Sequence, residues 1–159
     1  MGVLTDYFRA PDGASVVREL DRADAMSPVG PFPGVETKGV DPDVVLGMLI
    51  AAIRQVPWEV NLVGSAVVWP TTPPGPQGPE DEDDPWATGP WVMELDDAVR
   101  DTLAAVPDAD VPAVVTEWVR AEELHGTTAE DIRPFADDLI QLARQARDSG
   151  ERVYCWTCL

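Results

Sequence analysis

Residues 70–90 read PTTPPGPQGPEDEDDPWATGP and separate two apolar, patterned halves of the chain. This stretch holds seven prolines, five consecutive acids from Glu80 to Asp84 and no basic residue. Such a composition buries too little apolar surface to form a packed core. Because 159 residues suit one domain, we predict a single domain over residues 1–159 with a flexible, Pro- and acid-rich insert at about 70–90.

The charge balance limits the classes of partner. There are 29 acids and 11 bases, which gives a net charge of −18. Nucleic acids and anionic lipids are bound by clustered Lys and Arg, so we expect neither nucleic-acid nor membrane binding. A basic protein partner fits the charge, and so does a surface that simply keeps the protein soluble.

Localisation is predicted from the absence of targeting signals. The chain opens MGVLTDYFRA, without a basic region ahead of an apolar core, so no secretory signal is expected. The longest apolar run, residues 44–53, is too short for a span that needs about 20 residues. Ten of the eleven bases are Arg, which is typical of GC-rich bacterial genomes. We therefore expect a bacterial, cytoplasmic protein.

Periodicity and capping residues predict the secondary structure. Helices are expected after Asp12, Asp41, Asp96, Asp110 and Thr127 or Thr128, and the predicted extended segments are residues 3–9, 35–38, 58–63, 65–69, 91–95 and 152–159. Residues 58–69 are expected to form two short strands or one bent strand. Strands at both ends with helices between them indicate an α+β fold. We predict one small sheet that contains the N- and C-terminal strands, with about five helices packed on it.

The helix after Asp41 lacks a polar stripe. Its apolar residues point to nearly every side, which predicts deep burial. They are Val44, Val45, Leu46, Met48, Leu49, Ile50 and Ile53.

Three segments suggest a family. The opening MGVLTDYFRA, the Gly89–Val99 stretch GPWVMELDDAV and the closing helix with its DSG turn and terminal strand resemble the YfbM-like family of bacterial proteins. The middle helix of that family contains Trp and His, whereas the helix after Asp41 contains neither. The resemblance implies a small cytoplasmic α+β domain of unknown activity, and it carries over no catalytic residue.

Cys155-Trp156-Thr157-Cys158 has the C-x-x-C spacing of redox pairs and of half zinc sites. A redox pair usually precedes a helix, and here only Leu159 follows. Zinc needs four ligands, and His125 is the only histidine, so neither a zinc site nor a paired Glu-x-x-H iron site at Glu122 is expected. In a strand the two thiols point to opposite faces. Structural cysteines are favoured, and a thiol switch at Cys155 and Cys158 stays open.

No catalytic set is evident. None of the four serines lies in G-x-S-x-G, and the prolines of Gly30–Gly34 lack the N–H groups that cradle phosphate. We therefore assign no catalytic residue, metal or cofactor. Four tryptophans bracket the insert and either line a groove or seal the core beneath it, namely Trp58, Trp69, Trp86 and Trp91.

These observations favour a non-enzymatic, acidic protein-interaction or regulatory module, with a basic protein as its possible partner. A redox enzyme or sensor that uses Cys155 and Cys158 is the first alternative. Binding of a small ligand in a Trp-lined groove is the second.

Overall fold

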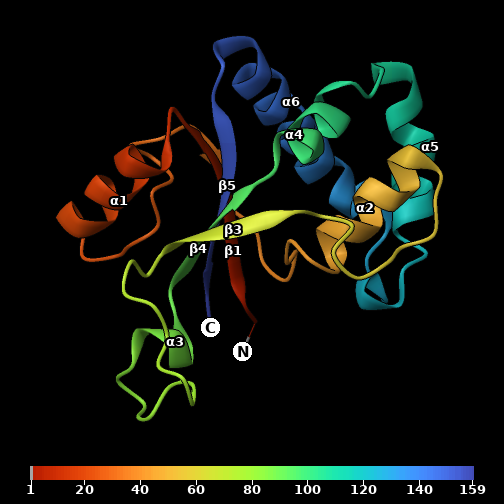
Figure 1. The fold of residues 1–159 in the computed structure, drawn as a ribbon. Coiled ribbons are helices and arrows are strands. Elements are labelled where there is room, and N and C mark those ends of the chain that lie inside the picture. Colours follow the sequence, from red (N-terminus) through yellow and green to blue (C-terminus); the bar gives the residue numbers. More distant parts are fainter. Residues whose placement is uncertain (1) are drawn as a thin grey trace.

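One five-stranded antiparallel sheet forms the centre of the computed structural model, which describes residues 2–159 (Figure 1). The strand order is β2-β1-β5-β4-β3. Their bounds are β1 Leu4–Ala10, β2 Gly34–Val35, β3 Ser65–Trp69, β4 Trp91–Leu95 and β5 Arg152–Cys158. The terminal strands β1 and β5 are central neighbours, with Tyr7 opposite Cys155. The predicted α+β fold with both terminal strands in one sheet is confirmed.

The helices divide between the two faces of the sheet. Their bounds are α1 Gly13–Arg22, α2 Val45–Arg54, α3 Pro85–Thr88, α4 Asp97–Ala104, α5 Val111–Trp118 and α6 Ala129–Ser149, with 3₁₀ turns η1 Asp108–Asp110 and η2 Glu122–Leu124. Helices α2, α4, α5 and α6 pack over one face, where the larger core includes Tyr7 and Cys155. Helix α1 covers the other face, where Phe8, Tyr154 and Trp156 belong to a smaller core.

Local capping signals explain where most helices begin and end. The Asp12 carboxylate accepts a hydrogen bond from the Ser15 N–H at 2.7 Å and so starts α1. Thr128 and Asp131 form a reciprocal capping box at the start of α6. At its end Gly150 adopts a left-handed conformation with φ of 67°. The Asp41 carboxylate accepts from the Val44 N–H at 2.7 Å, and α2 begins one residue later.

One predicted strand is wrong. Residues 58–63 form no strand, because Asn61 has a φ of 67° and the Leu62 N–H donates to the Glu59 carbonyl in a turn. Only Ser65–Trp69 pairs with β4, and its register is irregular between Val67 and Trp69. The segment before β3 is therefore free to lie against α2 instead of extending the sheet.

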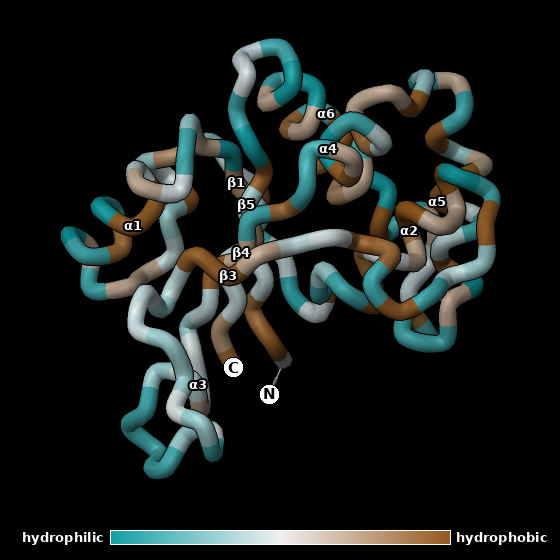
Figure 2. Tube along the Cα trace, viewed as in Figure 1, coloured by the Kyte–Doolittle hydropathy of each residue, from teal (hydrophilic) through white to brown (hydrophobic). Residues whose placement is uncertain are grey.

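The insert leaves the sheet between β3 and β4 and carries the short helix α3 (Figure 1). Its polar composition stands out from the strands that it joins (Figure 2). Residues 71–77 and the acids from Glu80 to Asp83 are all exposed. The Trp86 indole N–H donates to the Thr72 carbonyl at 2.8 Å and ties the two limbs together. Among residues 2–159, no helix is long and apolar enough to cross a membrane.

Candidate functional site

The structure places Cys155 and Cys158 on opposite faces of β5. Cys155 is fully buried in the larger core, whereas Cys158 packs against the smaller one. Three residues of strand span about 10 Å, and a disulfide needs Cα atoms within about 7 Å. Burial raises the pKa of the Cys155 thiol to about 12, while a reactive thiol needs a lowered one. The redox alternative therefore requires β5 to leave the sheet.

Metal ligands are not assembled in the part of the chain that the structure describes. No group of three or more His, Cys, Asp or Glu side chains there is placed to hold an ion. Glu122 and His125 are exposed, and they lie at the 3₁₀ turn η2 instead of on a regular helix. Neither residue therefore lies on a long helix that could face a second Glu-x-x-H segment, as a di-iron bundle requires.

The four predicted tryptophans do not line one surface. Trp69 packs against the smaller core, and Trp86 is held within the insert. Trp91 is half-buried beside the backbone of Gly89. Of the four, only Trp58 lines a groove between two helices, on the other side of the sheet. The insert and the groove are therefore separate features.

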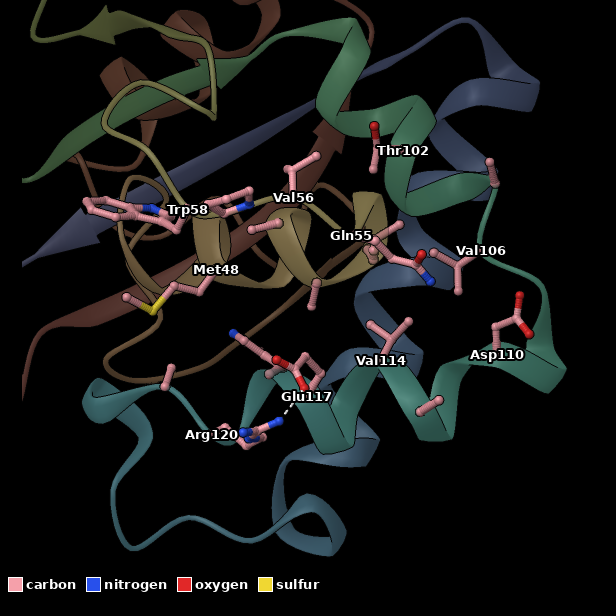
Figure 3. A pocket seen from close by; sticks show the side chains of 18 of the residues that line it. Met48, Gln55, Val56, Trp58, Thr102, Val106, Asp110, Val114, Glu117 and Arg120 are labelled. Atoms are coloured by element: carbon pink, nitrogen blue, oxygen red, sulfur yellow. Dashed lines mark hydrogen bonds and ion pairs between the residues drawn. The ribbon is translucent and has the colours of Figure 1, made fainter.

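This groove runs between α2 and α5 and is closed at one end by the connection from α4 to α5 (Figure 3). Its volume is about 1150 Å³. Met48, Val56 and Trp58 line the α2 side, and Val114 and Glu117 line the α5 side. Apolar side chains thus predominate among the lining residues, while polar groups contribute nearly as much of the lining surface.

The all-round apolar character of α2 explains why the groove exists. Leu46, Leu49 and Ile50 face inward and are fully buried in the larger core. Met48 and Ile53 are only half-buried and lie along the groove. Sequence reasoning missed these groove residues. The helix without a polar stripe was the available signal, because such a helix leaves an apolar face for another partner once one side packs on the sheet.

Trp118 connects the two walls. Its side chain is 1% exposed, and the indole N–H donates to the Val45 carbonyl on α2 at 2.9 Å. Its ring also packs against Phe135 of α6, with centroids 6.3 Å apart. Trp118 therefore holds α5 at a fixed position against both α2 and α6.

Gly47 allows Trp58 to lie against α2. The Trp58 indole N–H donates to the Asp43 carbonyl at 3.1 Å. A Cβ atom added to Gly47 would lie 2.7 Å from the indole nitrogen. A glycine inside a helix costs roughly 1 kcal/mol of stability relative to alanine. The close approach of the indole, which leaves no room for a Cβ atom, explains why glycine occupies this position.

We expect Gly47→Ala to displace the Trp58 ring and shift its fluorescence to longer wavelength, because the indole loses its place against α2. Emission spectra of the variant and the wild type check this. The same substitution in a Trp58→Phe background should leave the spectrum unchanged. An unaltered spectrum in the Trp58-containing variant would contradict this role of Gly47.

The rim of the groove carries charge of both signs. Asp110 and Glu117 project from α5 and the turn before it, and Glu117 pairs with Arg120 at 3.0 Å (Figure 3). Both partners of that ion pair are more than half exposed, so the pair contributes less than about 1 kcal/mol to stability. Either side chain can therefore change partners easily. Because the chain has a net charge of −18, we expect the groove to favour a cationic ligand.

Comparison of the chain with protein-family models, curated proteins and solved structures finds no match. The resemblance to the YfbM-like family stays a prediction.

Proposed function

We propose that this protein is a non-enzymatic interaction module whose α2–α5 groove binds an amphipathic helix of a basic partner protein. The observation that carries the proposal is the half-exposed apolar face of α2, opposite α5, in a strongly acidic chain. Helical peptides dock in such grooves by their apolar side, with anchors at i, i+3, i+4 and i+7.

The size of the groove suits such a segment. Helix α2 has 10 residues, which corresponds to about 15 Å at 1.5 Å per residue. A partner helix of about three turns would cover this length and bring three or four apolar side chains against Met48, Val56 and Val114. Basic residues on the flanks of that helix would meet Asp110 and Glu117. The long-range field of the acidic surface would speed their encounter.

We also propose where this module works and which partners it does not bind. We propose a cytoplasmic protein that binds neither nucleic acid nor membrane, since its charge repels phosphate and residues 2–159 contain no membrane-spanning helix. The thiol-dependent alternative receives no support from the geometry of Cys155 and Cys158.

Fluorescence anisotropy with three labelled peptides tests the groove. The first has Leu at helical a and d positions and Lys elsewhere over about four turns. The second has the same composition with Leu spread around the helix, and the third has Glu in place of Lys. We expect the first to bind and the second to bind at least about tenfold more weakly, a difference of roughly 1.4 kcal/mol. The third should not bind.

Two matched variants locate the binding. Ala113 is exposed and lines the groove, while Ala98 is exposed on α4 outside it. Ala113→Trp should fill the groove and lower the affinity of the first peptide at least about tenfold, whereas Ala98→Trp should leave it unchanged. Equal binding of the first two peptides, or unaltered binding by Ala113→Trp, would reduce the effect to unspecific charge attraction and reject the proposal.

A further inference from the structure

The outer edge of β3 is a second surface without a partner. Of the two edge strands, β2 has only two residues, whereas β3 has five and reads SAVVW. Proteins usually protect an edge with charged side chains or proline inside the strand. Strand β3 contains neither.

The backbone direction shows which groups face outward. The Asp96 N–H donates to the Gly64 carbonyl at 2.9 Å, just before the register pairs Ser65 with Leu95. Hydrogen-bonded pairs alternate along antiparallel strands. Ala66 therefore bonds to β4, while the N–H and C=O groups of Ser65 and Val67 point away from the sheet. No hydrogen bond from another segment within residues 2–159 reaches these four groups.

The side chains at this edge are also open. Ala66 is exposed and Val67 is 45% exposed. An added strand would cover Val67 and pair with the outward groups of β3 in the manner of β-strand addition. The register irregularity after Val67 limits the regular part of the edge to Ser65–Val67, so the added segment would be short.

The charge of the insert that follows β3 indicates what the added strand is. Strand β3 runs directly into the insert, in which the exposed acids Glu80–Asp83 follow along the chain (Figure 1). A second copy of the chain would bring another net charge of −18 and be repelled. We propose that β3 takes an extended segment of a partner protein, with a short β-forming stretch followed or preceded by Lys and Arg residues that lie against the insert. This surface is separate from the α2–α5 groove.

Binding of labelled peptides to the intact protein tests the edge. The probe has about five alternating Thr and Val residues, a favourable strand sequence, with three Lys at one end. A second probe is N-methylated at every residue of the strand segment, so that neither edge has an N–H to donate, and a third has Glu in place of Lys. We expect the first to bind at least about tenfold more tightly than either of the others. Absence of binding by the first probe, or equal binding by the N-methylated one, would overturn the proposal.

Proline substitution identifies the edge on the protein side. Val67→Pro removes only an outward N–H, which an edge strand tolerates, and should abolish binding of the probe while the protein stays folded. Ala66→Pro removes a bond to β4 and should instead lower the melting temperature. Ala113→Trp, in the groove, should leave the affinity of this probe unchanged. Unaltered binding by folded Val67→Pro would place the peptide elsewhere and reject the site.

Charge neutralisation tests the contribution of the insert. One triple variant removes three acids of the insert, Glu80→Gln, Glu82→Gln and Asp83→Asn. Its control removes three exposed acids near and within the start of α6, Glu122→Gln, Glu123→Gln and Glu130→Gln. We expect only the first variant to lower the affinity for the probe, by several-fold in low salt. Equal loss of affinity in both triple variants would show that the insert does not contribute to binding. If the protein self-associates and Val67→Pro abolishes that self-association, the edge binds a second copy of the chain and the proposal is overturned.

Discussion

Raising the pH from 8 to 11 is expected to destabilise the folded protein steeply. Burial raises the pKa of Cys155 from about 9 to about 12. Burial, followed by the nearby Cys155 charge, raises the pKa of Tyr7 well above 10. The pKa of Tyr154 is also raised, by burial and by its hydrogen bond to Glu94 at 2.8 Å. All three groups are neutral when protonated, so the folded state holds their protons more tightly than the unfolded chain does.

The sign and the pH range follow from this difference in proton binding. For Cys155 the stabilisation is complete below the unfolded pKa near 9 and is lost as the pH rises toward 12. Within that range the free energy of unfolding falls by about 1.4 kcal/mol per pH unit for this thiol alone. The two tyrosines add to the loss above their unfolded pKa near 10.

Urea unfolding at several pH values between 8 and 11, in the presence of a reductant, measures this slope. Cys155→Ala should lower the slope by about 1.4 kcal/mol per pH unit above pH 9.5, even though it also lowers the stability at every pH. Cys158→Ala is the matched control and should keep the wild-type slope. If Cys155→Ala shows the same pH dependence as the wild type, the buried thiol does not contribute in this way.

Trp118→Ala is expected to destabilise the protein by about 3–5 kcal/mol, the usual cost of removing a buried aromatic side chain. The side chain is 1% exposed and packs against Phe135, and its N–H donates to the Val45 carbonyl. Its loss would leave a cavity where α2, α5 and α6 meet. Because this contact holds the two walls of the groove, we expect the groove peptide to lose its affinity as well.

Chemical unfolding of Trp118→Ala, Trp118→Phe and Trp58→Ala separates the contribution of packing from that of the hydrogen bond. Trp118→Phe keeps most of the packing and loses the hydrogen bond to Val45, so its cost should be about 1–3 kcal/mol. Trp58→Ala removes a half-buried ring at the rim and should cost less than Trp118→Ala. A loss below 1 kcal/mol for Trp118→Ala would mean that α5 is held in place by other contacts.

Capping residues and strand alternation predicted much of the fold, because each depends only on residues a few positions away in the chain. Asp12 caps α1, Thr128 and Asp131 cap α6, and Gly150 ends it. The alternating first strand and the terminal strand lie in one sheet as expected, where they pair directly with each other. Residues 58–63 were predicted to be extended because Val and Trp favour strands, but the turn at Asn61 overrides that preference.

The candidate site was only partly visible in the sequence. The helix after Asp41 indicated an apolar surface on every side, yet which side would stay uncovered depends on where α5 packs. The tryptophans around the insert were expected either to line one groove or to seal the core beneath it, and only Trp58 of the four lines the α2–α5 groove. Strand order is set by contacts between distant residues, so the unpaired edge of β3 was equally hidden.

Composition and short-range patterns were thus sufficient for the α+β class, most element positions, the exposed insert and the acidic surface, because these depend on solvation and on neighbours along the chain. The α2–α5 groove, the separation of the two thiols and the open edge of β3 arise from long-range packing. Trp118 joins α2 and α5 across 73 positions of the chain, a contact that no local pattern encodes.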